Sequence, residues 1–267
     1  MGFRLVTLNL NGIRSAANKG FVDWAATVGA DCMGVQEIRA QGEHVEGTLD
    51  RVAGLRGHFH YARKKGYSGV GLYTKKVPSS IVTGFDGGEF DDEGRWVEAR
   101  FDSLSTRRRF KKFSVISAYF PSGSSGEDRQ AAKFRFLARV YPHLMALKAE
   151  REFILVADVN VAHQAIDLKN WRSNQKNSGF LPEERAWMTQ LLGEGGLVDV
   201  FRTLNPHPEQ YTWWSNRGQA WANNVGWRLD YHLATPGIAA LARKEHIYLD
   251  QRFSDHAPLT IDYDFTL

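Results

Sequence analysis

Residues 152–160 read E-F-I-L-V-A-D-V-N, in which the unbroken apolar run 153–157 is followed by an acid, Asp158, and an amide, Asn160. The five residues 153–157 leave no exposed face, which predicts a strand buried on both faces in the middle of a sheet. Side chains two positions apart on an extended chain point the same way, so Asp158 and Asn160 can reach one target. The pair indicates the floor of an active site. An Asx-type turn leaving the strand is the alternative, and this stretch alone does not choose between them.

The composition is that of a globular protein that fits one domain over residues 1–267. Hydrophobic residues make up 43% of the chain and charged residues 24%, and no Pro/Ser linker or internal repeat divides it. The 34 basic and 30 acidic residues leave a net charge of +4, which suits a polyanionic partner but is not polybasic. Eight Trp and nine Tyr exceed what a core needs, so some are expected on a binding surface.

The single cysteine, Cys32, excludes an intramolecular disulfide and a multi-cysteine metal site. Residues 1–10 lack the apolar core and cleavage site of a signal peptide. No apolar run approaches the ~20 residues of a membrane span. We therefore expect a soluble monomer without a membrane partner, in the cytoplasm and, in a bacterium, associated with the nucleoid.

Strands recur along the chain and only a few helices interrupt them. Strands are predicted at 3–8, 31–35, 57–63, 69–74, 78–83, 95–101, 113–118, 153–157, 211–215, 227–233, 246–249 and 259–263. Helices are predicted from Ser15, as the cap, to Gly29, within 40–55, over 127–148 with a kink or restart at Pro142, and over 182–193. Residues 161–180 form a polar loop too long for a simple connection. This pattern favours helices packed outside two sheets.

The basic run T-R-R-R-F-K-K at 106–112 suggests nucleic-acid binding at first sight. It lies at a predicted hairpin before the strand at 113–118. We expect a solvated, charged edge there instead, because such runs protect exposed strand edges.

Polar side chains gather at the ends of the predicted strands. Each is a weak signal alone, since a lone Glu or His is more often on the surface than catalytic. A sheet would collect them in one cleft, which raises their combined weight. They are Asn9, Asn11, Glu37, Tyr119, Asp158, Asn160, Asp230, Asp255 and His256.

The sequence motifs that contain these residues resemble those of the exonuclease III family of DNA-repair endonucleases, within the deoxyribonuclease I-like fold. The matching motifs, in the family's order from the first strand to the last, are L-N-L-N-G-I-R (8–14), V-Q-E (35–37), S-G-V-G-L-Y (68–73), Y-F-P-S-G (119–123), D-V-N (158–160), G-W-R-L-D-Y (226–231) and S-D-H-A-P (254–258). Segments N-V-A-H-Q-A-I-D-L-K-N and N-Q-K-N-S-G-F, within 160–180, resemble the apurinic/apyrimidinic branch. Two positions depart from the family: Ala157 replaces a usual Gly, and Arg39 a common Lys.

The resemblance implies a four-layered α/β sandwich (α+β by segregation), with two packed mixed sheets flanked by helices. It implies a Mg²⁺-dependent endonuclease, with Mn²⁺ as a possible substitute, that cuts double-stranded DNA 5′ to abasic sites and leaves a 3′-hydroxyl. Trimming of blocked 3′ ends, as exonuclease or phosphodiesterase, would accompany it. A non-catalytic nucleic-acid-binding regulator of the same fold is the alternative, and a same-fold phosphatase or lipid phosphodiesterase is a third.

The resemblance also implies roles for individual residues. The divalent ion is assigned to Glu37, with Asn9 and Asp255 as direct or water-mediated partners. Asp158 would orient or deprotonate the attacking water and Asn160 would fix its geometry. His256, paired with Asp230, would contact the phosphate, and Tyr119 would donate a hydrogen bond to it. Whether Asp158 or His256 is the base, and whether one or two ions bind, stays open.

Substrate contacts are implied for a further set of residues. Trp213, Trp227 and Leu229 match an apolar pocket for a base-free sugar, with core packing as the alternative. Alternation along a strand complicates this, because it puts Trp227 and Leu229 on one face and Asp230 on the other. The loop with Arg217 and Trp221 would insert into or rest on the duplex, or be merely solvated. Asn11 and Arg39 complete the substrate-binding set.

Overall fold

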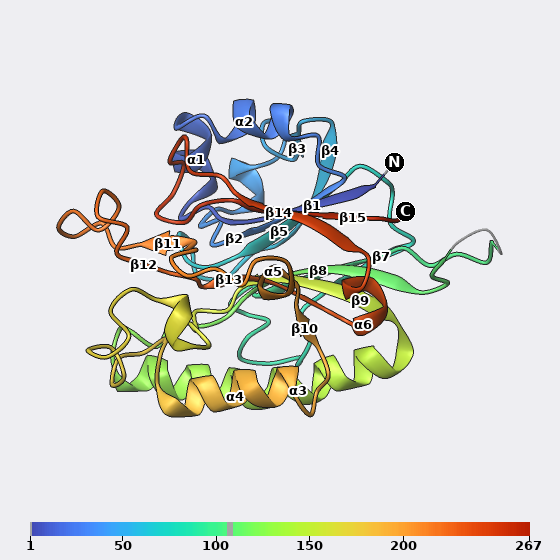
Figure 1. The fold of residues 1–267 in the computed structure, drawn as a ribbon. Coiled ribbons are helices and arrows are strands. Elements are labelled where there is room, and N and C mark those ends of the chain that lie inside the picture. The colour runs from blue at the N-terminus through green and yellow to red at the C-terminus, as the bar shows by residue number, and fades with distance from the viewer. Residues whose placement is uncertain (1, 106–108) are drawn as a thin grey trace.

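The computed structural model describes residues 2–105 and 109–267, which form two main β-sheets packed face to face (Figure 1). In the first sheet the strand order is β14 (Ala242–Ile247), β15 (Leu259–Tyr263), β1 (Phe3–Asn9), β2 (Cys32–Gln36), β5 (Val70–Thr74), β4 (Leu55–His60) and β3 (Arg51–Val52). In the second it is β10 (Val198–Asp199), β13 (Asp230–Ala234), β9 (Glu152–Asp158), β8 (Phe113–Tyr119), β7 (Trp96–Arg100) and β6 (Ser80–Thr83). A small ribbon pairs β11 (Trp213–Trp214) with β12 (Gly226–Trp227).

Both main sheets are mixed. The pairs β1–β2 and β8–β9 run parallel, and the other described neighbours run antiparallel. The first and last strands, β1 and β15, pair side by side. This pairing agrees with the expected single domain, which stays a prediction.

An apolar core fills the space between the sheets. Leu5 and Val70 from the first sheet and Val115 and Val156 from the second are fully buried in it. Gly34 of β2 lets the sheets approach, since a Cβ there would lie 2.4 Å from Cγ2 of Val156. The continuous apolar run at 153–157 follows from burial on both faces, as expected for a central strand.

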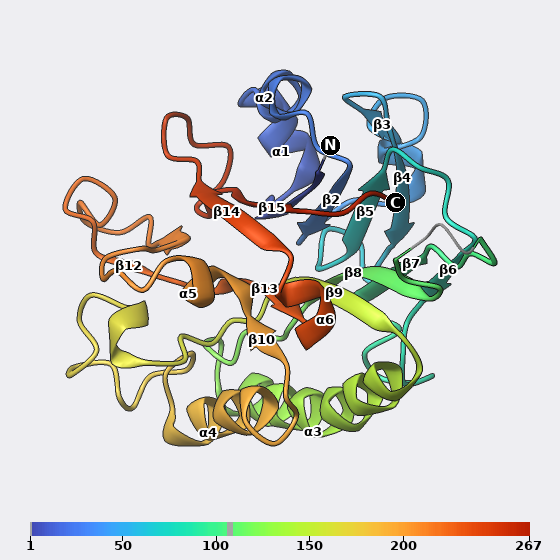
Figure 2. The same cartoon turned by 45° about the vertical axis from the view of Figure 1, so that its right-hand side comes forward.

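Helices form the two outer layers (Figures 1 and 2). The helices α1 (Ile13–Asn18) and α2 (Phe21–Val28) and the 3₁₀ turn η1 (Gly42–His44) flank the first sheet. The helices α3 (Glu127–Glu150) and α4 (Pro182–Leu192) cover the second. The predicted four-layered α/β sandwich with flanking helices is confirmed. Shorter elements are η2 (Ala165–Asp167), α5 (Val200–Leu204) and α6 (Pro236–Ala239).

One helix prediction was wrong in a way that residue conformation explains. The helix expected from Ser15 is two helices, because Gly20 adopts a left-handed conformation (φ 94°) between them, and Ser15 lies inside α1 rather than capping it. The helix expected over 127–148 is α3, which continues through Pro142 without a restart.

The strand expected at 227–233 was also wrong, and its break matters for the site. Thr212 Oγ1 accepts hydrogen bonds from the backbone N–H of Leu229 and of Asp230, at 3.0 and 3.1 Å. These bonds separate β12 from β13, so strict alternation does not run from Trp227 to Asp230.

The predicted hairpin at 106–112 lies partly outside the described residues, which omit 106–108. Within the described ranges, none of the helices has the length and apolar character that crossing a membrane requires.

Candidate active site

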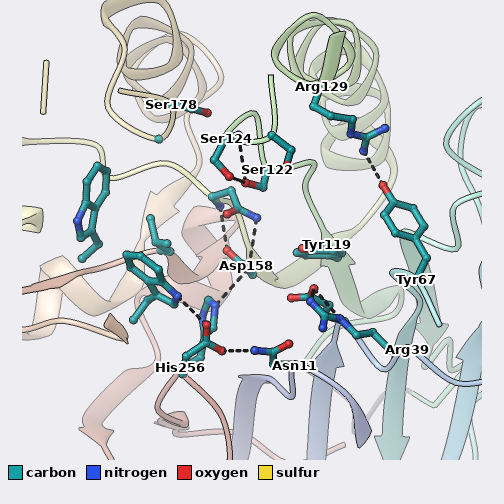
Figure 3. Close-up of a pocket in the computed structure, with 18 of the residues that line it drawn as sticks. Asn11, Arg39, Tyr67, Tyr119, Ser122, Ser124, Arg129, Asp158, Ser178 and His256 are labelled. Carbon is teal, nitrogen blue, oxygen red and sulfur yellow. Dashed lines mark hydrogen bonds and ion pairs between the residues drawn. The ribbon is translucent and has the colours of Figure 1, made fainter. Parts of the chain in front are cut away.

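The ends of strands from both sheets meet at one cavity of about 550 Å³ (Figure 3). From the second sheet, Asp158 ends β9, Tyr119 ends the parallel neighbour β8, and Asp230 begins the antiparallel neighbour β13 opposite Asp158. From the first sheet come Asn9 at the end of β1, Glu37 after β2, and Asp255 and His256 before β15. The structure therefore brings the strand-end side chains together, with Asn9 and Asp230 fully buried behind the cavity lining that the others form.

Asp158 lies at the centre of this group and is almost completely buried. Its Oδ2 accepts hydrogen bonds from Nδ2 of Asn9 at 2.8 Å and from Nδ2 of Asn160 at 3.3 Å. Its Oδ1 accepts one from the Asn160 backbone N–H at 3.0 Å. Burial raises the pKa of Asp158 to about 7, although the nearby His256 and the Asn9 hydrogen bond favour the charged form. A carboxylate with such a pKa can accept a proton near neutral pH.

His256 lies between two carboxylates. Its Nδ1 is 2.8 Å from Oδ2 of Asp230, and its Nε2 is 3.7 Å from Oδ2 of Asp158. Burial opposes the charged imidazole, but Asp230 and Asp158 outweigh it and raise the pKa of His256 to about 10. The ring is thus a cation at neutral pH.

Glu37 faces the cavity from the other sheet. Its Oε2 accepts a hydrogen bond from Nδ2 of Asn9 at 3.0 Å, and its Oε1 accepts one from Nε of Arg39 at 2.9 Å. Asn9 is fully buried and donates to both Glu37 and Asp158. It therefore fixes the relative position of the two carboxylates.

Asp255 is held by three donors. Asn11 Nδ2 donates to its Oδ1 at 2.8 Å, Ser254 Oγ donates to the same oxygen at 3.1 Å, and Trp213 Nε1 donates to its Oδ2 at 3.1 Å. Burial opposes ionisation, but the charge on His256 and these hydrogen bonds outweigh it and lower the pKa of Asp255. Asp255 is consequently a carboxylate at neutral pH.

The backbone is strained around this cavity. Among the described residues, eight non-glycine residues have a positive φ, and five of them lie in or beside the cavity: Asn11, Glu37, Arg39, Ser68 and Asn160. Such conformations cost about 1–3 kcal/mol each and cluster where function requires a fixed geometry.

An apolar wall closes one side of the cavity. Trp213, Trp227 and Leu229 line the cavity and pack with Phe180 and Leu168. Because β12 ends at Trp227 and β13 begins at Asp230, the apolar side chains can line the cavity while Asp230 lies buried beside His256, which removes the conflict with strand alternation. Both tryptophans are only partly buried, so core packing does not fully account for them.

Two predicted contact residues lie outside the cavity lining. Arg217 is exposed in the loop between β11 and β12, and Trp221 in the same loop packs on Trp214 at 4.4 Å between ring centroids. The Arg252 guanidinium lies 4.5 Å from the Trp221 ring. The loop projects from one end of the molecule (Figure 1), and its role in DNA binding stays a prediction.

The opposite wall contains residues that the sequence analysis missed. Tyr67 OH accepts hydrogen bonds from Arg129 at 2.6 Å and Arg95 at 3.0 Å, and Glu93 is paired with both arginines. Arg95 also lies 5.0 Å from the Tyr119 ring centroid. Burial and the charges on Glu37 and Asp158 raise the pKa of Tyr119, so its hydroxyl remains a proton donor. The position of Tyr67 directly before the S-G-V-G-L-Y motif was the one available signal.

The donor set at the cavity fits a hard divalent cation. Glu37 and Asp255 both face the cavity and offer carboxylate oxygens, the ligands that Mg²⁺ prefers. Among the described residues, one atom each of Asp158, Asp230 and His256 also lie within 4.8 Å of one another. The Glu37 and Asp255 carboxylates and this cluster are therefore the candidate places for a divalent cation.

Comparisons with known proteins agree with this geometry. Residues 6–256 match the model of the Endonuclease/Exonuclease/phosphatase family. The chain is 32% identical to an exodeoxyribonuclease of Bacillus subtilis, over 97% of this chain and 98% of that protein. It is 33% identical to the DNA repair nuclease APEX1 of Danio rerio, over 97% of this chain and 81% of that protein. An AP endonuclease structure from Archaeoglobus fulgidus superimposes with a TM-score of 0.86 at 26% identity, covering 98% of this chain and 99% of that chain.

Proposed function

The chain belongs to the Endonuclease/Exonuclease/phosphatase family, and we propose that within it the protein is a Mg²⁺-dependent DNA-repair endonuclease. Its substrate is the phosphodiester 5′ to an abasic site in duplex DNA, and its products carry a 3′-hydroxyl and a 5′-phosphate. One observation carries the proposal: Asp158, hydrogen-bonded to Asn9 and Asn160 and 3.7 Å from a protonated His256, lies in the cavity that the apolar wall closes.

Glu37 and Asp255 would hold the divalent ion, and Asn9 would orient Glu37 through their 3.0 Å hydrogen bond. When bound, the ion supplies neutralisation of the negative charge on the phosphate. Mn²⁺, which accepts the same oxygen donors, would substitute for Mg²⁺.

Asp158 takes a proton from the attacking water, and Asn160 keeps its carboxylate in place. The water oxygen forms a bond to phosphorus while the bond from phosphorus to the 3′ oxygen breaks, and the released 3′ oxygen takes a proton from solvent water to become the 3′-hydroxyl. His256, as a cation held by Asp230, pairs with a phosphate oxygen, and Tyr119 donates a hydrogen bond to the phosphate. The raised pKa of Asp158, about 7, and that of His256, about 10, support this division between base and cation.

Selection of the damaged nucleotide falls to the apolar wall. A deoxyribose without its base can leave the helix at low unstacking cost and pack against Trp213, Trp227 and Leu229. A nucleotide that carries its base would bring a polar ring into the same space. Asn11 and Arg39 on the opposite rim contact the DNA backbone, and the loop with Arg217 and Trp221 rests on the duplex.

Removal of blocked 3′ ends accompanies incision, because a 3′-terminal phosphodiester presents the same bond to the same groups. The similarity to an exodeoxyribonuclease supports this second activity. A non-catalytic regulator is not favoured, since every acidic, amide and imidazole group of the proposed chemistry is present. We also propose that the protein acts as a cytoplasmic monomer.

One experiment tests the main proposal. A duplex oligonucleotide with a single tetrahydrofuran abasic analogue, and the same duplex undamaged, are incubated with the protein in Mg²⁺ or in EDTA. We expect one cut, 5′ to the analogue, in Mg²⁺ only, and its loss in Asp158→Ala. The control variant Glu43→Gln, at an exposed carboxylate, should cut normally. Equal cutting of the undamaged duplex, or no cut at the analogue, overturns the proposal.

A further inference from the structure

Two oppositely charged side chains are completely buried behind the active site and take no part in the proposed chemistry. Nζ of Lys133, on α3, lies 2.7 Å from Oε1 of Glu184, on α4, and neither side chain is exposed. Taking such charges out of water costs several kcal/mol per ion, and packing alone would be served as well by apolar residues. Their placement therefore calls for a reason beyond stability.

Each partner of this pair also binds the backbone of a turn that lines the cavity. Nζ of Lys133 donates to the carbonyl oxygen of Asn160 at 2.7 Å. Oε2 of Glu184 accepts hydrogen bonds from the backbone N–H of Gly179 at 2.7 Å and of Leu181 at 3.0 Å. The pair thus joins the turn after β9 to the turn before α4, two segments that the sequence separates by almost twenty residues.

Both turns have constrained conformations that determine where their side chains point. Asn160 has a φ of 56°, and its Nδ2 reaches Phe120 O at 3.0 Å and Asp158 at 3.3 Å. Gly179 has a φ of 93°, and a Cβ there would lie 3.2 Å from both Asn160 O and the Trp227 ring. The two turns are in direct contact, because the backbone N–H of Ala162 donates to the carbonyl oxygen of Gly179 at 2.8 Å. In Figure 3, Ser178 lies on this helix-facing side of the cavity, above Asp158.

We propose that Lys133 and Glu184 are positioning residues, which hold the Asn160 turn against Gly179 and so fix Asn160 on Asp158 and Asp158 relative to Trp227. The inference rests on the proposed function, because it assigns the pair to the nuclease site. Neither residue touches substrate. The expected consequence of losing the pair is a slower chemical step rather than weaker binding, since the groups displaced are those that act in the transition state.

A purely stabilising role makes a different prediction, and the two can be separated. Removing Lys133 alone leaves the Glu184 carboxylate buried without its counter-ion, so that Lys133→Met should destabilise the fold whatever its role. The double variant Lys133→Met/Glu184→Gln leaves no buried charge at these two positions and keeps an acceptor for Gly179. Its stability should recover, while the bond from Lys133 to Asn160 stays absent.

The experiment compares wild type, Lys133→Met, the double variant and Leu144→Ala. Leu144 is fully buried on the same helix and faces the core away from the cavity, so its truncation is the matched control for lost stability. Thermal unfolding, kcat and KM on the abasic duplex, and hydrogen exchange of the Asn160 side-chain amide are measured. In the double variant we expect near-native unfolding, a kcat about 10- to 100-fold lower, a KM within about threefold, and faster amide exchange. In Leu144→Ala we expect native kcat and exchange.

If the double variant recovered kcat as well as stability, the proposal would be overturned. An unchanged hydrogen-exchange rate of the Asn160 side-chain amide in that variant would also overturn it. The exchange measurement needs no substrate. If the wild-type protein failed to cut abasic DNA, the proposed function would fall, whereas the position of Asn160 would still be tested.

Discussion

Nδ1 of His256 lies 2.8 Å from Oδ2 of Asp230, while Nε2 of the same ring faces Asp158 at 3.7 Å. The two carboxylates together overcome the cost of burying the charge and raise the pKa of His256 to about 10. An imidazole that is already protonated at neutral pH cannot accept the proton of the attacking water. The relationship supports the proposal that Asp158 is the base and that His256 pairs with the phosphate, a choice that the sequence alone left open.

Replacing Asp230 by Asn should make activity depend on pH in a new way. The variant keeps the shape of the side chain but removes its charge, so the pKa of His256 should fall toward its ordinary value near 6.5. His256 is then protonated at pH 6 and neutral at pH 8.5. We expect kcat/KM relative to wild type to drop about 10²-fold at pH 8.5 and clearly less at pH 6.

The control for this change is Asp250→Asn, at an exposed carboxylate, which should follow the wild-type profile. A ratio of variant to wild type that is flat across pH would contradict the role given to the Asp230 charge.

Glu37→Gln should weaken metal binding. The substitution preserves an oxygen and the contact with Asn9 but removes the negative charge, so we expect at least a 10-fold higher Mg²⁺ concentration for half-maximal activity. Binding of Mn²⁺, followed by the loss of its free electron paramagnetic resonance signal, should shift in parallel. Glu43→Gln serves as the control, and an unchanged Mn²⁺ affinity in Glu37→Gln would place the ion elsewhere.

Trp227→Ala and Trp221→Ala each remove an indole side chain, the first from the cavity lining and the second from the loop between β11 and β12. Trp227 lines the cavity, and its loss should lower kcat/KM on the abasic duplex about 10-fold while leaving affinity for undamaged duplex unchanged. Trp221 lies in the outer loop, and its loss should weaken binding of damaged and undamaged duplex equally. Competition binding and steady-state kinetics with both duplexes check this. If both variants changed kcat/KM and duplex affinity in the same way, the apolar wall would not be what selects the abasic substrate.

Arg217→Ala tests whether the loop between β11 and β12 contacts DNA. Each phosphate contact that a protein loses reduces the slope of log affinity against log salt by about 1. We expect that change for Arg217, which is exposed, and none for Arg243→Ala, an exposed arginine on β14 that pairs with Asp264. Binding titrations at several salt concentrations measure the slope. An unchanged slope for Arg217→Ala would mean that the loop is simply solvated.

The features that the sequence predicted well are those that local patterns encode. The apolar run at 153–157 predicted a central strand, and the spacing of Asp158 and Asn160 predicted a shared direction toward one target. The two sheets and flanking helices follow from many such local signals. The resemblance to a known family then fixed which strand ends should meet.

The features that the sequence missed depend on contacts between distant residues. Lys133 and Glu184 are 51 positions apart, so their pairing becomes visible only in the folded structure. The contacts among Tyr67, Arg95 and Arg129 likewise form only when the loops before β5 and β7 fold against the start of α3. The break between β12 and β13 depends on one hydroxyl, that of Thr212, which no periodicity reveals.

Asp167→Asn should destabilise the protein at neutral pH but not in acid. Burial opposes ionisation of Asp167, but Arg228 and Arg202 outweigh it and lower its pKa to about 2, against 3.8 ordinarily. A depressed carboxyl pKa stabilises the fold above about pH 4, and the contribution is lost as the pH falls toward 2. The shift corresponds to about 2 kcal/mol in the free energy of unfolding. Urea unfolding at pH 7 should show at least this loss, because Arg228 is also left with one partner fewer, and the loss should shrink from pH 4 downward.

Asp264→Asn, whose side chain is 66% exposed beside Arg243, should change the free energy by less than about 1 kcal/mol at either pH. A loss for Asp167→Asn that persisted unchanged in acid would show that its hydrogen bonds, rather than its charge, hold the loop before α4.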